Sequence, residues 1–125
     1  MLARYKIYRG TRPPGEPLPN GVRQDTRKHT KHCLRPPEDI VTDYLANPTP
    51  SAWIRLEAEY LRILKRRYDE NAQPFDELAR LATADDVFIG CSCPTKKNPD
   101  MNRCHTNLAL QFMKERYPDL RVEFP

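Results

Sequence analysis

The sequence predicts a small α/β fold, in which helices pack on a mostly parallel three-stranded sheet. Three observations support this prediction. A short segment near the N-terminus alternates apolar with charged residues, and residues 86–91 form a continuous apolar run, so both have strand patterns. The long segments between and after them have apolar residues at helical spacing. Strands that are separated by helices need crossover connections, which favour parallel pairing.

The length of 125 residues suits one domain, and we expect it to span residues 1–125. No apolar run approaches the length of a membrane-spanning helix, and the N-terminus lacks the apolar core of a secretory signal. We therefore expect a cytoplasmic protein with no membrane partner, and leave its oligomeric state open. In that compartment, four cysteines are expected to be thiols or metal ligands rather than a disulfide framework.

The first strand is expected at residues 3–9, where Tyr5 and Ile7 alternate with charged or polar neighbours. Gly10 ends this strand. A Pro/Gly-rich basic loop without regular structure is expected at about residues 10–35. Such a long loop is uncommon in a compact domain and is often functional or mobile.

Three helical segments are expected after the loop. The first opens at residues 36–39, with prolines at its start and acids near the positive end of the helix dipole. The second is expected to begin with Ser51 as its N-cap and to continue to about Asp69. The third is expected at residues 74–83, where apolar side chains recur at helical intervals.

The apolar run at 86–91 predicts a strand that is buried on both faces. A polar loop at 94–103 separates this strand from a further helix, which Pro118 stops. Residues 121–124 are expected to form a short final strand at an edge of the sheet.

Three cysteines and one histidine fall between the end of the buried strand and the start of the last helix. Cys91 and Cys93 follow the strand, whereas Cys104 and His105 open the helix. Because ligands of parallel α/β sheets bind beyond the carboxyl ends of the strands, we expect these residues at one functional rim. The segment Gly10-Thr11-Arg12 is expected at the same rim if the two strands are parallel neighbours.

One interpretation is an enzyme or ligand-binding pocket for a phosphorylated or otherwise anionic small molecule, such as a nucleotide. Cys91, Cys104 and His105 would be the reactive groups, because a helix N-terminus lowers the pKa of a nearby thiol and a histidine can act as its base. The remaining ligand contacts would come from Arg9, Thr11, Arg12, Lys96, Arg103 and Thr106.

A second interpretation is a non-catalytic site, held by zinc or closed by a disulfide. Its candidate ligands are thiolates and an imidazole, which zinc prefers, from Cys91, Cys93, Cys104 and His105. The spacing is not that of a common zinc finger. Residues from the basic loop, namely His29, His32 and Cys33, could complete such a site.

A third interpretation is purely structural, because free cysteines are often buried in the core.

The charge of the chain is asymmetric. Residues 1–35 contain nine Lys/Arg and two acidic residues, giving +7, whereas residues 36–125 contain twelve and fifteen, giving −3. A basic loop can bind phosphate, so nucleic-acid binding by the N-terminal loop is a further hypothesis. A solvated, charge-rich surface explains the same pattern without any ligand.

The region from about residue 52 to residue 115 resembles two uncharacterised families, the domains of unknown function four-eight-eight and four-three-two-six. The similarity lies in a strand that ends in Cys91 and in Cys104-His105 at the start of a helix. It implies a small α/β sandwich with an active or ligand site at Cys91, Cys104 and His105, and no known reaction. This chain has Thr106 where one form of the signature has Arg, and it adds Cys93.

Overall fold

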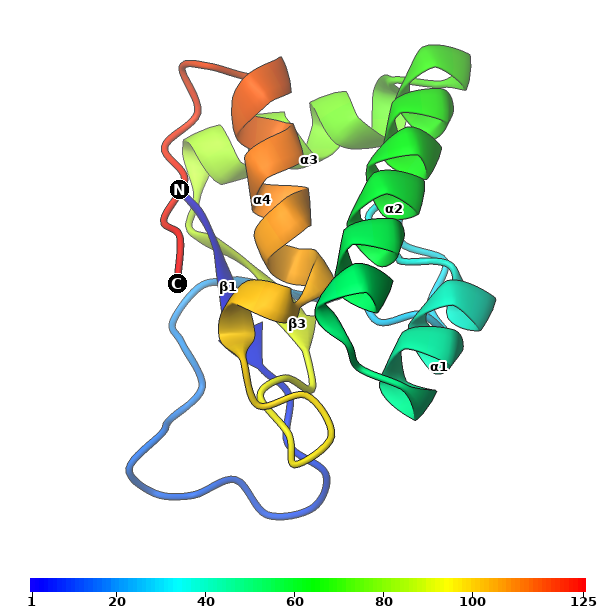
Figure 1. Ribbon diagram of the computed structural model, residues 1–125. Helices are drawn as coiled ribbons and strands as arrows, with labels where there is room; N and C mark the ends of the chain where they lie inside the picture. Colours follow the sequence, from blue (N-terminus) through cyan, green and yellow to red (C-terminus); the bar gives the residue numbers. More distant parts are fainter.

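The computed structural model describes all residues, 1–125, and has the predicted α/β fold (Figure 1). Three strands, β1 (Leu2–Lys6), β2 (Val22–Asp25) and β3 (Val87–Cys91), form one sheet in the order β1-β3-β2. Both pairings are parallel, as predicted. In this register Lys6 lies opposite Cys91 and Asp25 opposite Gly90, so the carboxyl ends of all three strands meet at one edge.

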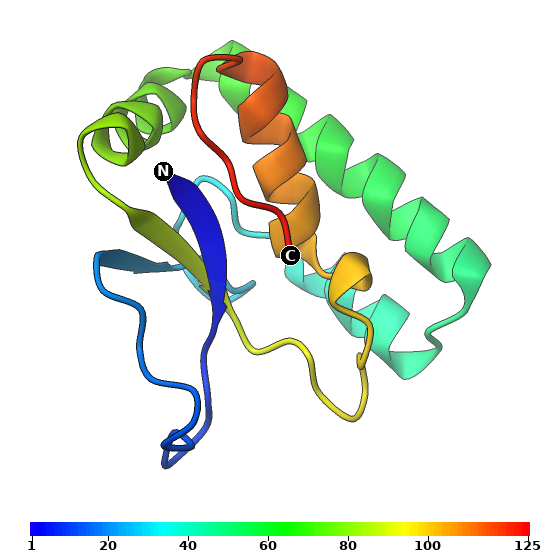
Figure 2. The ribbon, with the colours of Figure 1, turned by 90° about the vertical axis from the view of Figure 1, so that its left-hand side faces the viewer.

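The helices are α1 (Glu38–Ala46), α2 (Pro50–Glu70), α3 (Gln73–Ala84) and α4 (His105–Arg116), with a short 3₁₀ helix η1 (Met101–Arg103) before α4. Helices α2 and α4 lie side by side over one face of the sheet, and α3 crosses near the amino end of β3 (Figures 1 and 2). No helix combines the length and the apolar character that crossing a membrane would need.

The core lies between α2, α3, α4 and the inner face of the sheet. Leu2, Val87 and Ile89 from the strands are fully buried there. The helices contribute fully or nearly fully buried apolar side chains, which are Leu56, Tyr60, Leu64, Phe75, Leu78, Ala82, Leu108, Phe112 and Met113. Phe88, which alternates with Val87 and Ile89 on β3, is only partly buried, so the outer face of β3 is less enclosed than expected.

The caps of the helices agree broadly with the sequence pattern. Helix α1 follows Pro37 and has Glu38 and Asp39 in its first turn. Helix α2 begins two residues earlier than expected, because Thr49 rather than Ser51 is its N-cap. The Thr49 hydroxyl accepts a hydrogen bond of 3.1 Å from the Ala52 amide.

The third strand of the sheet differs from the prediction. Residues 10–35 were expected to have no regular structure, but they contain β2, which pairs with β3 along its whole length. Residues 121–124 were expected to be a strand, but they form only a single-residue bridge between Val122 and Leu2. The sequence Val-Arg-Gln-Asp of β2 carries one apolar residue, so pairing with β3 rather than local propensity determines this strand.

Candidate metal centre

Three thiols meet at the carboxyl edge of the sheet. Cys91 is the last residue of β3, Cys93 follows it in the next loop, and Cys104 is the N-cap residue of α4. Their Sγ atoms all lie within 4.8 Å of one another, and Cys91 Sγ and Cys93 Sγ are 3.9 Å apart. We call these three residues the cysteine trio. The fold thus brings together side chains that the sequence placed at one rim.

The spacing of the trio suits a metal ion. Tetrahedral zinc with metal–sulfur bonds of about 2.3 Å needs sulfur atoms about 3.8 Å apart. The measured Cys91–Cys93 separation is close to that value, and all four cysteines of the chain are free thiols. The cysteine trio could therefore hold a thiophilic ion after a small contraction.

The trio is mostly enclosed. Cys104 is 2% exposed and Cys91 is 9% exposed, whereas Cys93 is half-buried. Hydrogen bonds from Cys91 and Cys93, supported by His105, hold the pKa of Cys104 well below its usual value. The same contacts with Cys104, together with burial, raise the pKa of Cys91 and of Cys93. These contacts favour the thiolate form at Cys104 over the thiolate forms of Cys91 and Cys93.

Two neighbouring side chains donate hydrogen bonds to the sulfur atoms. The Thr106 hydroxyl donates to Cys104 Sγ at 3.1 Å, and the Asn98 amide donates to Cys93 Sγ at 3.2 Å. The Asn98 amide also donates to the Arg103 carbonyl at 2.8 Å, which fixes its orientation. Such donors stabilise thiolates and orient metal ligands.

Arg4 supports this arrangement from β1. Its Nε donates to Thr106 Oγ1 at 3.0 Å, and its Nη2 donates to the Cys93 carbonyl at 2.7 Å. Lys6, which is two residues further along the same strand, donates from Nζ to the Pro94 carbonyl at 2.6 Å. Two cations of β1 therefore hold the backbone of the loop that carries Cys93.

His105 lies beside the trio, but its ring nitrogens are not among the grouped donor atoms. Thr26 is fully buried, and its hydroxyl donates to the Gly90 carbonyl at 3.0 Å. The same oxygen lies 3.0 Å from His105 Nε2 and can only accept there, so Nε2 carries a hydrogen. The His105 ring also packs edge-on against Tyr60. These contacts hold the ring in place, and neither ring nitrogen belongs to the group of close donor atoms, so the role of His105 as a metal ligand stays a prediction.

Comparison with known proteins adds no further evidence on this site. The chain matches no protein-family model, and we found no matching curated protein and no matching solved structure. The resemblance to the two uncharacterised families therefore stays a prediction. The chemistry of the site has to be argued from its geometry.

The other residues expected to bind an anion lie in different places. Thr106 is at the trio, as described above. Arg9 and Thr11 are exposed on the loop after β1, which extends away from the sheet (Figure 1). Arg12 is hydrogen-bonded to the carbonyls of Lys6 and Glu16, so it closes that loop on itself. None of these loop residues is hydrogen-bonded to the trio.

Two expected residues lie on the loop between β3 and α4. Lys96 is exposed at a tight turn, where Thr95 and Asn98 exchange backbone hydrogen bonds. Arg103 is partly buried and lies 4.0 Å from the exposed Asp100 in an ion pair. Both belong to the segment that carries Cys93, and neither side chain is hydrogen-bonded to a sulfur atom of the trio.

The candidates from the basic loop do not reach the trio. His29 is exposed and lies 3.9 Å from Asp25. His32 donates from Nε2 to Gln24 at 2.7 Å and accepts at Nδ1 from the Leu34 amide at 3.0 Å. Cys33 packs against the core instead. Most cations of this loop are likewise hydrogen-bonded to their own chain, including Arg23, Arg27, Lys28 and Arg35.

Sequence reasoning missed four residues that surround the site, which are Arg4, Lys6, Thr26 and Asn98. Only the two in β1 had a usable signal, because they alternate along one strand and therefore share a face. Thr26 and Asn98 lie in irregular segments. Their roles depend on contacts with residues that are distant in sequence or held by loop geometry.

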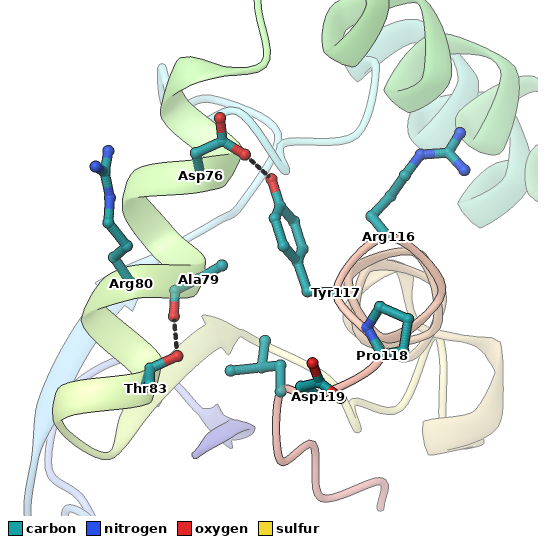
Figure 3. A pocket seen from close by; sticks show the side chains of 9 residues that line it. Asp76, Ala79, Arg80, Thr83, Arg116, Tyr117, Pro118 and Asp119 are labelled. Carbon is teal, nitrogen blue, oxygen red and sulfur yellow. Dashed lines mark hydrogen bonds between the residues drawn. The ribbon is translucent and has the colours of Figure 1, made fainter.

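A surface groove lies away from the trio. It has a volume of about 580 Å³ and runs between α3 and the segment after α4 (Figure 3). Within it, the Tyr117 hydroxyl donates to Asp76, and burial together with this hydrogen bond raises the pKa of Tyr117. Arg80 and Arg116 point away (Figure 3). A smaller pocket is lined by Gln24, His32 and Cys33. Neither is lined by a residue of the trio.

Proposed function

We propose that this protein binds a thiophilic metal ion, Zn²⁺ in the first instance, through Cys91, Cys93 and Cys104. The observation that carries the proposal is the convergence of three Sγ atoms within 4.8 Å at the joint between β3 and α4. Thiolates are the preferred ligands of zinc and of other soft ions.

The hydrogen bonds around the trio favour a metal site over a chance cluster of core cysteines. Asn98 is a buried amide in a loop, and it donates to Cys93 Sγ. Thr106 is fully buried and donates to Cys104 Sγ. A purely apolar core would not need two buried polar side chains aimed at its sulfur atoms, because burying polar groups costs free energy.

Burial favours a metal ion over direct attack by a cysteine on a substrate. A nucleophile must approach the reacting atom of its substrate, but Cys104 and Cys91 are almost fully enclosed. An ion can enter from the side of the half-buried Cys93. Once bound, it would join the end of β3, the following loop and the start of α4, and would therefore stabilise this part of the fold.

Elemental analysis of protein purified without a chelator tests this proposal. We expect about one equivalent of zinc in the wild-type protein, and loss of zinc together with thermal stability in Cys93→Ser. Cys33→Ser is the matched control, because Cys33 is also a half-buried free thiol but lies outside the trio. Circular dichroism checks that both variants are folded.

Three results would contradict the metal site or its assigned ligands. Protein that stays metal-free after zinc is added, with all four thiols titratable, would overturn the proposal. Equal zinc content in Cys93→Ser and Cys33→Ser would overturn the assignment of the ligands. An intramolecular disulfide within the trio, seen in the intact mass of unreduced protein, would replace the metal by a covalent link.

A further inference from the structure

We propose that the metal ion keeps one coordination position open, and that a phosphate or carboxylate oxygen of a small anionic molecule occupies it. This inference rests on the metal site proposed above. It adds a ligand class and a binding mode to that site. Arg4 and Lys6, which hold the loop of Cys93, would attract the anion to this position.

The chain supplies three donor atoms and no fourth. The group of mutually close ligand atoms contains only the sulfur atoms of the trio. Neither ring nitrogen of His105 belongs to that group, and the amide of Asn98 already bonds Cys93 and the Arg103 carbonyl. Zinc in proteins is normally four-coordinate, and sites with three protein ligands leave the fourth position to water or substrate.

The open position faces the carboxyl edge of the sheet. Cys91 and Cys104 are buried towards the core, and Cys93 is the partly exposed member of the trio. The loop after β3 projects beyond the ends of the strands (Figures 1 and 2). An external ligand would therefore reach the ion from the side of Cys93, next to the end of β1.

The charges at this edge favour an anion. Zn²⁺ with three thiolates carries a net charge of −1, because +2 and −3 are combined. Arg4 and Lys6 bring two positive charges to the carbonyls of Cys93 and Pro94, and neither cation forms an ion pair with a carboxylate. The metal site and these two side chains together retain a positive charge, so a further negative ligand is stabilised.

Hydrogen-bonding capacity favours an oxyanion over a thiolate as the fourth ligand. The Lys6 ammonium group has three N–H donors, and Pro94 accepts one of them. A phosphate or carboxylate can bind the metal through one oxygen and accept from Lys6 through another. A thiolate has a single ligand atom, so it offers Lys6 no second atom beside the one on the metal.

Cobalt-substituted protein gives a direct test with the full chain. Co²⁺ should bind in about one equivalent without phosphate, and its visible absorption bands should then shift saturably as inorganic phosphate or acetate is added. X-ray absorption of the zinc form should show three sulfur neighbours and one oxygen neighbour. Cobalt content after dialysis checks that phosphate has not removed the metal.

Lys6→Gln tests the role of the cation. Glutamine keeps an N–H donor on a side chain one atom shorter but removes the charge, so phosphate affinity should fall about tenfold while Co²⁺ affinity stays almost unchanged. Lys65→Gln is the control, because Lys65 lies on the exposed face of α2 and should leave both affinities unchanged.

The outcomes separate this inference from the metal site itself. Failure of the wild-type protein to bind Co²⁺ or Zn²⁺ would overturn both. Normal Co²⁺ binding with bands that ignore phosphate and acetate would overturn only the open position for an oxyanion. A fourth sulfur or histidine neighbour in the zinc protein, or a response to small thiols alone, would overturn it as well.

Discussion

The hydroxyl of Thr106 donates a hydrogen bond of 3.1 Å to Cys104 Sγ and accepts one of 3.0 Å from Arg4 Nε. Arginine can only donate, so the single hydroxyl hydrogen of Thr106 must point at the sulfur atom. Arg4 of β1 is thereby connected through Thr106 of α4 to the trio. The contact orders Cys104 Sγ, which belongs to the most buried residue of the trio.

Thr106→Val should therefore weaken both the fold and the metal site. Valine keeps the shape of the side chain but leaves Arg4 Nε and Cys104 Sγ without their partner. We expect the free energy of unfolding to fall by about 1–3 kcal/mol and zinc affinity to fall about tenfold or more. Urea unfolding and competition with a zinc chelator measure the two effects. Thr106→Ser keeps the hydroxyl and should stay near wild type, so equal losses in both variants would contradict this role.

His105→Ala should reduce stability without removing the metal. The ring packs against Tyr60 and donates to Thr26, but its nitrogens do not belong to the trio. We expect a loss of about 2 kcal/mol or more in the free energy of unfolding, with zinc content unchanged. Elemental analysis of the variant, at a temperature where it is folded, measures its zinc content. Loss of zinc in this variant would instead support His105 as a metal ligand, as the sequence predicts.

The stability of the protein should fall as the pH is lowered through the range of His32. Burial, with a smaller contribution from His105, lowers the pKa of His32 to about 4 in the folded protein, against about 6.5 when unfolded. Between these two pKa values, His32 is protonated in the unfolded chain but neutral in the folded protein. The stabilisation is fully present above about pH 6.5 and is lost as the pH falls towards 4.

Urea unfolding at about pH 7.5 and about pH 5 should show a loss of about 2 kcal/mol from this residue, since carboxylates titrate mostly below that range. His32→Gln should have a flatter profile, although its stability at neutral pH is lower. His29→Gln is the matched control, because His29 is exposed and should leave the profile unchanged. Parallel profiles for wild type and His32→Gln would contradict the assignment.

Gly90→Ala should destabilise the central strand. A Cβ atom at Gly90 would lie 2.6 Å from Ile7 Cδ1 and 2.8 Å from Tyr5 Cε1. Relieving these contacts requires the side chains of Tyr5 and Ile7 to move, at a cost of about 1–3 kcal/mol in the free energy of unfolding. Gly15→Ala meets no atom within 4 Å and should be neutral or slightly stabilising. Thermal unfolding of the two variants measures the difference.

The sequence by itself determined the class of the fold and the place of the trio. The apolar run of β3 and the helical spacing in α2, α3 and α4 are local patterns, so they can be recognised without tertiary contacts. Because Cys91 ends a strand and Cys104 opens the next helix, their proximity follows from the general layout of parallel α/β sheets.

Only the tertiary structure decided what surrounds the trio. Strand β2 is too polar to be recognised locally and depends on its pairing with β3. The register that sets Lys6 opposite Cys91 brings Arg4 and Lys6 to the loop of Cys93, and the fold alone places Thr26 against His105. These contacts join segments far apart in the chain, and their energy depends on packing geometry that no local pattern encodes.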